Sequence, residues 1–394
     1  MLKRMLVVTA MIAVLGFAVS VAQADMFVLK PIDDPGLGYT YSEVADVQIE
    51  WASATGRHYH YGGAATFGIG TSWASWPGGG WRLSLVQFDL DTIEAPPGAT
   101  LATVNSATLR LFQTAGGAGN MTLARMLEDW EEGTSGGTWG QIFDGANAYA
   151  RNMGHSTLPG DLVQTQHNGA DVWYFDATDL AVNPVDDDAY YHYIARRDST
   201  GVGVFRNFDL HGRRLSQADD LDDLITWDGD ITRVYYYDEV AERVYLATGS
   251  YQIHWFQTGD LWADLRDETA TRGPREGSWD DDDLYQTVLS GSGDWTEVDI
   301  TGMVEKWLID GEANFGMALY NNPHNDSSFS FASSEENRFW NPDSGEWSNE
   351  WQTGFWYVQP ELILDLSFAM PIPEPAGLSL LGLALLGLKR KRRR

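Results

Sequence analysis

The clearest strand pattern in the sequence is Leu83-Ser84-Leu85-Val86-Gln87-Phe88-Asp89-Leu90. Apolar and polar side chains largely alternate along it, which is typical of a half-buried β-strand. The segment Ala107-Thr108-Leu109-Arg110-Leu111-Phe112 has the same pattern and is followed by the turn-forming run Gly116-Gly117-Ala118-Gly119. The side chains expected in the core are Phe88, Leu90, Leu109 and Leu111.

Many more short apolar and aromatic runs lie between Gly, Asn and Asp clusters, which indicates an all-β protein. The further strands expected are 171–176, 190–195, 232–237, 243–247, 251–256, 296–300, 316–320, 329–332 and 357–368. One short helix is expected where Met303, Val304, Trp307 and Leu308 share a face, with Asp299 or Thr301 as its cap and Gly311 at its end. The prediction is an antiparallel β-sandwich, jelly-roll-like, with one short helix.

Acidic side chains concentrate between about residues 180 and 290, at 186–188, 219–223 and 280–283. We interpret this stretch as a long acidic insertion in the sandwich; the sequence leaves open whether it forms extra strands or a second small domain. The expected organisation is a leader over 1–24, a folded part over 25–370 and a sorting tail over 371–394.

Composition excludes several classes of function. The chain of 394 residues has no cysteine, so disulfides, zinc–thiolate sites and thiol nucleophiles are ruled out. Its formal net charge of −30 would repel the phosphates of nucleic acids. Clustered carboxylates attract calcium, which is therefore the one cofactor considered, although no spacing picks out its ligands.

The N-terminus has the three parts of a secretory signal peptide. Lys3 and Arg4 precede an apolar run over 5–21, and Ala22-Gln23-Ala24 forms a small-x-small site. We expect signal peptidase to cut after Ala24. An uncleaved membrane anchor is the competing interpretation, but the run is a little short for a span of ~20 residues.

The C-terminus carries a second export-related pattern. Pro373, Glu374 and Pro375 precede an apolar run over 376–388, and six basic residues end the chain. The prolines form a stiff spacer, and the basic residues favour the cytoplasmic side of a membrane. This order resembles the PEP-CTERM sorting signal, which implies transient membrane insertion of the tail and exosortase as a processing partner. A plain tail anchor is the alternative.

Two groups of motifs carry a second resemblance. The first group comprises His60-Tyr61-Gly62, Phe88-Asp89-Leu90, Ser106-Ala107-Thr108-Leu109-Arg110-Leu111 and Glu128-Asp129-Trp130-Glu131-Glu132-Gly133-Thr134. The second comprises Asp299-Ile300-Thr301, Trp307 with Gly311, and Asn314-Phe315-Gly316, before a closing strand at Glu361-Leu362-Ile363-Leu364. Together they resemble the DNRLRE domain, which implies a carbohydrate-binding-module-like β-sandwich of a surface protein. His60 replaces the family's usual Asn, and the insertion between the groups is longer than usual.

Tryptophans outside apolar runs are the candidate ligand-binding residues, because flat aromatic rings stack on sugar faces. The candidates are Trp340, Trp347, Trp351 and Trp356 in one polar stretch, and Trp73 and Trp76 beside a Gly-rich stretch. Trp130 and Trp307 are expected to be core anchors instead.

No arrangement of Ser, His, Asp, Tyr or Arg singles out a catalytic site. The preferred hypothesis is a non-catalytic cell-surface or matrix protein that binds extracellular polysaccharide. A purely structural or adhesive envelope protein is the second hypothesis, and a polysaccharide lyase or hydrolase is the third.

Overall fold

The structure is a computed structural model. It describes residues 22–31, 40–52, 57–60, 62–72, 80–134, 145–146, 150–153, 163–176, 189–196, 206–209, 216–218, 220–223, 233–238, 240–247, 252–262, 278–321, 327–350, 352 and 355–370. The predicted sorting tail, including Pro373, Glu374 and Pro375, lies outside these residues. Within the described part of the chain, no helix is long and apolar enough to cross a membrane.

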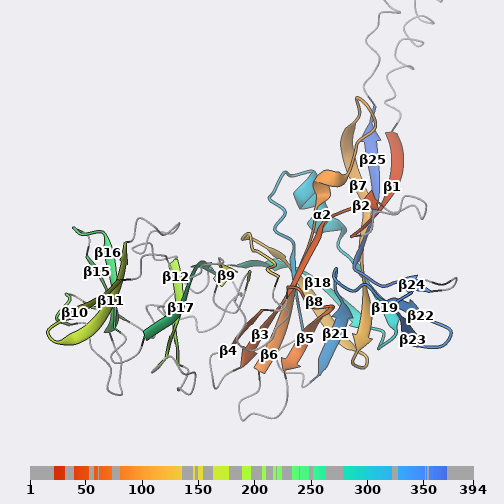
Figure 1. Ribbon diagram of the computed structural model, residues 1–394. Helices are drawn as coiled ribbons and strands as arrows, with labels where there is room; N and C mark the ends of the chain where they lie inside the picture. The colour runs from red at the N-terminus through yellow and green to blue at the C-terminus, as the bar shows by residue number, and fades with distance from the viewer. Residues whose placement is uncertain are drawn as a thin grey trace, which may run out of the picture.

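The largest sheet of the described chain has thirteen strands, and all its pairings are antiparallel except that of β1 with β2 (Figure 1). Its strands are β1 (Ala22–Lys30), β2 (Thr40–Tyr41), β3 (Val44–Ala52), β4 (Arg57–His60), β5 (Thr66–Ser72), β6 (Gly80–Phe88), β7 (Thr100–Ala115), β8 (Gly119–Met126), β18 (Trp279–Leu289), β19 (Asp294–Asp299), β20 (Met317–Tyr320), β21 (Ser328–Ala332) and β25 (Glu361–Ala369). The main path runs β18-β8-β20-β6-β5-β21-β7-β25-β1-β2, while β19 pairs with β7 and β3 pairs with β4 and β6. The predicted all-β antiparallel architecture is confirmed.

Side chains from several strands of this sheet pack against one another to form the main core. Alternate residues of β25 enter it, and Leu364 and Leu366 are fully buried there. Leu109 and Leu111 of β7 lie in the same cluster, as predicted. The period-2 alternation of these two strands thus selects the buried face.

Strand β6 differs from its predicted half-buried state, because both its faces are covered. Val86 and Phe88 enter the main core, whereas Leu83 and Leu85 enter a second cluster on the other face. That second cluster contains Trp262, which is fully buried. The phase change of the apolar pattern between Leu85 and Val86 is the sequence trace of this double burial.

Helix α2 (Thr301–Leu308) closes one part of the core with Met303, Val304 and Trp307, as predicted. The N-cap residue is Ile300, which has no side-chain capping bond, and not the predicted Asp299 or Thr301. Asp299 instead precedes the cap and accepts hydrogen bonds from the Thr301 amide (3.0 Å) and hydroxyl (2.6 Å). The same hydroxyl accepts a hydrogen bond from the Ala107 amide, which connects the start of the helix to β7. The chain turns away at Gly311, whose φ of 74° suits a residue without a Cβ.

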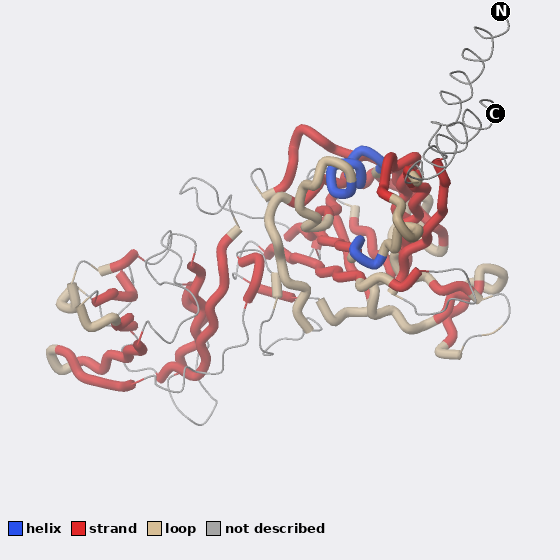
Figure 2. Tube along the Cα trace, turned by 90° about the horizontal axis from the view of Figure 1, so that it is seen from above, coloured by secondary structure: helices blue, strands red, loops and turns tan. Residues whose placement is uncertain are grey.

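Between β8 and β18 the chain leaves the large sheet (Figures 1 and 2). Its strands form two smaller sheets, of orders β10-β11-β16-β15-β14 and β13-β12-β17-β9. They are β9 (Ala150–Met153), β10 (Val163–His167), β11 (Ala170–Asp176), β12 (Ala189–Arg196), β13 (Arg206–Asp209), β14 (Ser216–Gln217), β15 (Arg233–Asp238), β16 (Arg243–Ala247) and β17 (Gln252–Leu261). Trp262, directly after β17, anchors the excursion in the second cluster.

The excursion therefore differs from the predicted insertion at both ends, since it begins before residue 180 and its strands end before residue 279. The acidic run 280–283, interpreted as part of the insertion, lies in β18, where it forms a bulge between the residues Trp279 and Leu284 that pair with β8. Two of its four carboxylates have cationic partners: Asp280 contacts Arg125 (2.9 Å) and Lys306 (3.1 Å), and Asp283 contacts Lys306 (2.8 Å). Acidity alone cannot distinguish a solvated loop from a strand whose carboxylates have basic neighbours.

Candidate functional site

Three of the candidate tryptophans lie in one row. A small sheet pairs β22 (Phe339–Asn341) with β23 (Glu346–Ser348) and with β24 (Trp356–Tyr357). Trp340 lies opposite Trp347 on one side and opposite Trp356 on the other. Directly opposed residues of antiparallel strands share a face, so the three indoles line one face of this sheet.

The base of the row is an aromatic contact with the large sheet. The Phe112 ring of β7, which is fully buried, lies 5.5 Å from the Trp340 ring and 6.1 Å from the Trp347 ring between centroids. Trp340 and Trp347 are partly buried in this cluster with Ala332 and Val358. The apolar neighbours that the local sequence lacks are therefore supplied by distant strands.

Trp356, at the other end of the row, keeps 39% of its surface exposed. The row thus runs from packed indoles to an exposed one. A partly exposed indole held by packed neighbours can stack on a flat apolar face of a ligand with little loss of side-chain freedom.

Two arginines lie over indole faces near this sheet. The Arg338 guanidinium is 4.6 Å from the Trp347 ring centroid, and that of Arg110 is 4.6 Å from the Trp295 ring centroid. Glu336 binds Arg338 through both carboxylate oxygens, at 2.7 and 2.6 Å. The Arg338 charge is therefore balanced locally, and the Trp347 face that it covers is not free for a ligand.

The remaining predicted residues fall into three groups. Trp351, Trp73 and Trp76 lie outside the described residues. Trp130 and Trp307 are 8% and 6% exposed, so both are core anchors as predicted. Ala24 lies within β1 opposite Ser367, so the expected cleavage site is in a paired strand.

A second site, which the sequence did not indicate, is a cluster of three carboxylates. Asp46 of β3, Glu132 and Glu335 each place one oxygen within 4.8 Å of the others. It is the one group of at least three such ligands found in the described part of the chain. Asp46 is fully buried, Glu132 is half-buried and Glu335 is exposed, so the cluster runs from the interior to solvent.

Backbone contacts hold these side chains in place. The Asp46 amide donates to Glu132 Oε1 (2.9 Å), and the Ser334 amide donates to Asp46 Oδ2 (2.6 Å). Gly62 packs so closely against the Glu132 carbonyl that a Cβ at position 62 would lie 2.0 Å from that oxygen. Gly62 and the acidic motif that contains Glu132 thus meet at this cluster.

Burial dominates the electrostatics of the cluster. It raises the pKa of Asp46 well above its usual range, with Glu335 and Glu132 adding repulsion against the Ser334 hydrogen bond. Burial also raises the pKa of Glu132 to about 8, opposed by the Asp46 amide and reinforced by Glu335. The pKa of Glu335 is also raised, chiefly because its carboxyl loses solvent beside the other two, although the residue as a whole is exposed. Three carboxylates so close together need protons or a cation to neutralise them.

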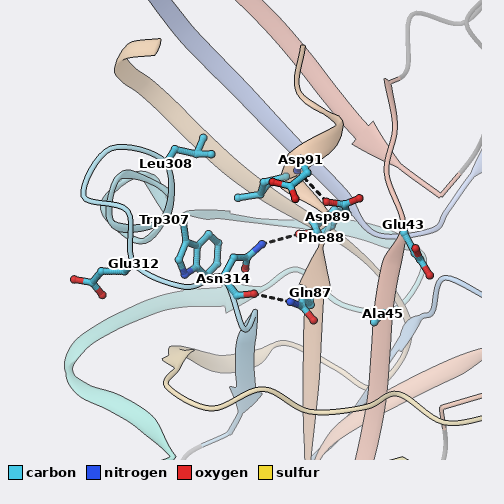
Figure 3. A pocket seen from close by; sticks show the side chains of 11 residues that line it. Glu43, Ala45, Gln87, Phe88, Asp89, Asp91, Trp307, Leu308, Glu312 and Asn314 are labelled. Carbon is cyan, nitrogen blue, oxygen red and sulfur yellow. Dashed lines mark hydrogen bonds between the residues drawn. The ribbon is translucent and has the colours of Figure 1, made fainter. Parts of the chain in front are cut away.

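A pocket of about 520 Å³ lies between α2 and β6 (Figure 3). Trp307 and Leu308 form one wall, and Glu43 lies on the opposite side. Its two amides are occupied by the protein itself: Gln87 donates to the Asn314 carbonyl (2.6 Å), and Asn314 donates to the Phe88 carbonyl (2.8 Å). These bonds connect β6 to the segment before β20, so the amides primarily serve the fold.

Comparison of the chain with protein-family models, curated proteins and solved structures found no match. The assignment of a function therefore depends on the residues described above.

Proposed function

We propose that this chain is an exported, non-catalytic protein of the cell surface or extracellular matrix that binds polysaccharide at the sheet β22–β24. The observation that carries the proposal is the row of three indoles that ends in the exposed Trp356. Pyranose rings present flat CH faces that stack on indoles, while surrounding polar groups bond their hydroxyls.

Charge narrows the class of polysaccharide. The formal net charge of −30 opposes simple electrostatic capture of anionic chains. Arg338, which lies over Trp347, and Arg110, which lies over the neighbouring Trp295, already have carboxylate partners. A neutral glycan is therefore the preferred ligand, and an anionic one would need divalent cations as bridges.

The sorting part of the proposal rests on the two chain ends. The expected cut after Ala24 would leave Asp25 as the first residue, still paired with Leu366 of β25. Because proteases act on accessible extended chain, signal peptidase must cut before β1 pairs. Exosortase would then act in the Pro373-Glu374-Pro375 region, which follows β25 in the sequence.

The test is calorimetric titration of the full-length chain, in a mild non-ionic detergent, against neutral and anionic polysaccharides with calcium or chelator. New reducing or unsaturated chain ends are monitored in the same samples. We expect saturable binding to a neutral glycan without new ends. The Trp356→Ala variant should lose about tenfold or more in affinity, about 1.4 kcal/mol, and Trp356→Phe should lose less.

A matched control is Trp173→Ala, which removes a partly buried indole from β11 in another sheet. Equal losses in Trp356→Ala and Trp173→Ala would contradict a site at β22–β24. New chain ends would replace the proposal with an enzyme. No binding to any polysaccharide would favour a structural or adhesive envelope protein.

A further inference from the structure

We infer that Asp46, Glu132 and Glu335 form a binding site for one Ca²⁺ ion that joins three distant segments of the sandwich. Asp46 comes from β3, Glu132 from the segment after β8, and Glu335 from the turn after β21. This site is separate from the indole sheet, so the inference does not depend on glycan binding.

One oxygen of the buried Asp46 carboxylate has no hydrogen-bond partner. Asp46 has no exposed surface, and its Oδ2 accepts a hydrogen bond from Ser334. Its Oδ1, in contrast, is buried without a hydrogen-bond partner. A buried carboxylate oxygen without a partner costs free energy, which a cation at this position would recover.

The spacing of the three carboxylate oxygens suits Ca²⁺. Ca²⁺ binds oxygens at about 2.3–2.6 Å, so two oxygens on one ion can be up to about 5 Å apart. The three carboxylate oxygens lie within 4.8 Å of one another. Mg²⁺, at about 2.0–2.1 Å, requires a tighter and more regular octahedron. The observed spread therefore suits the larger ion.

The cluster is open to solvent on one side and is rich in negative charge. Glu335 is exposed, so an ion can enter from solvent and release its water stepwise. The three carboxylates would together carry three negative charges when ionised, which attracts a divalent cation. Three carboxylates provide three to six oxygens, and water can complete the six to eight that Ca²⁺ takes.

The turn that carries Glu335 is already fixed by further hydrogen bonds. The Ser333 hydroxyl donates to the Ala64 carbonyl, and its amide donates to the Ala65 carbonyl (3.2 Å). The Gln359 amide donates to the Ser334 carbonyl (2.8 Å). The turn that carries Glu335 is thus bound to the start of β5 and to the segment before β25.

The experiment is titration of the full-length chain, stripped of metal by chelator, with Ca²⁺ alone and with Mg²⁺ alone. Calorimetry measures Ca²⁺ binding. Luminescence of Tb³⁺, a Ca²⁺ substitute excited through tryptophan, reports an ion bound close to an indole. We expect one Ca²⁺ site with a dissociation constant of about 10⁻³ M or tighter, as in extracellular calcium modules. Mg²⁺ should bind at least about tenfold more weakly.

The variants are Glu335→Gln and Asp46→Asn, with Glu131→Gln as the matched control. Glu131 is exposed and adjacent to Glu132 but does not belong to the cluster. We expect Glu335→Gln to lower the Ca²⁺ affinity by at least about tenfold and Glu131→Gln to leave it within about twofold.

The order of melting temperatures distinguishes an ion site from a merely structural cluster. In chelator, Glu335→Gln should melt at or above the wild-type temperature, because it removes a repelling charge. In about 5 mM Ca²⁺ the wild type should melt at a higher temperature than Glu335→Gln, because Ca²⁺ binding stabilises only the protein with intact ligands. The absence of saturable Ca²⁺ binding, equal affinity in Glu335→Gln, or an unchanged order of melting temperatures would each overturn the site.

Discussion

Phe112 supports the indole sheet, and its removal should therefore be costly. The substitution Phe112→Ala deletes a ring that is fully buried and lies 5.5–6.1 Å from the rings of Trp295, Trp340 and Trp347. Phe buries roughly 150–250 Å², and losing about half of that apolar area costs about 2–3 kcal/mol at about 25 cal/mol per Å². A residual cavity of up to about 100 Å³ adds up to about 2 kcal/mol.

The expected loss in the free energy of unfolding is therefore about 2–5 kcal/mol. Urea unfolding, followed by tryptophan fluorescence and far-UV circular dichroism, measures it. The matched control is Phe339→Ala on the small sheet itself, where the ring is partly buried and contacts Tyr357 at 4.9 Å. That variant should lose only about 1 kcal/mol. A loss below about 1 kcal/mol for Phe112→Ala, or equal losses in both variants, would refute the packing argument.

Three further predictions concern the sandwich. Hydrogen bonds from Thr301 lower the pKa of Asp299. Because this carboxylate is exposed and screened by solvent, Asp299→Asn should cost only about 0.5 kcal/mol at pH 7. In pH-dependent unfolding this difference should disappear as the pH falls below about 3.9 and through the lower pKa of the folded state. Gly119→Ala should cost about 1–3 kcal/mol in urea unfolding, because its Cβ would lie 2.2 Å from Phe329 Cζ in a filled core, and an unchanged midpoint would contradict this. Trp130→Phe should lower the melting midpoint by the equivalent of about 1 kcal/mol, because the indole loses a 2.8 Å hydrogen bond to a backbone carbonyl; a neutral result would show that water replaces it.

Local sequence patterns were enough to predict the all-β class, the short helix and the strands β6, β7, β19, β20, β21 and β25 of the large sheet, but not β1, β3, β5, β8 or β18. These follow from local rules, because side-chain alternation with period 2 sets the buried face of a strand and the period of 3.6 sets that of α2. Trp130 and Trp307 were likewise predictable as core anchors, since the large indole side chain usually packs inside a protein.

The bounds of the excursion and the exposure of the indoles depend on contacts between residues that are far apart in the sequence. Trp340 and Trp347 have no apolar neighbours in sequence, yet strands far along the chain bring Phe112 and Val358 against them. The carboxylate cluster is an even clearer case, because Asp46, Glu132 and Glu335 come from three segments with no shared spacing. Long-range strand pairing places such residues together, and no local pattern records which partners the sheet selects.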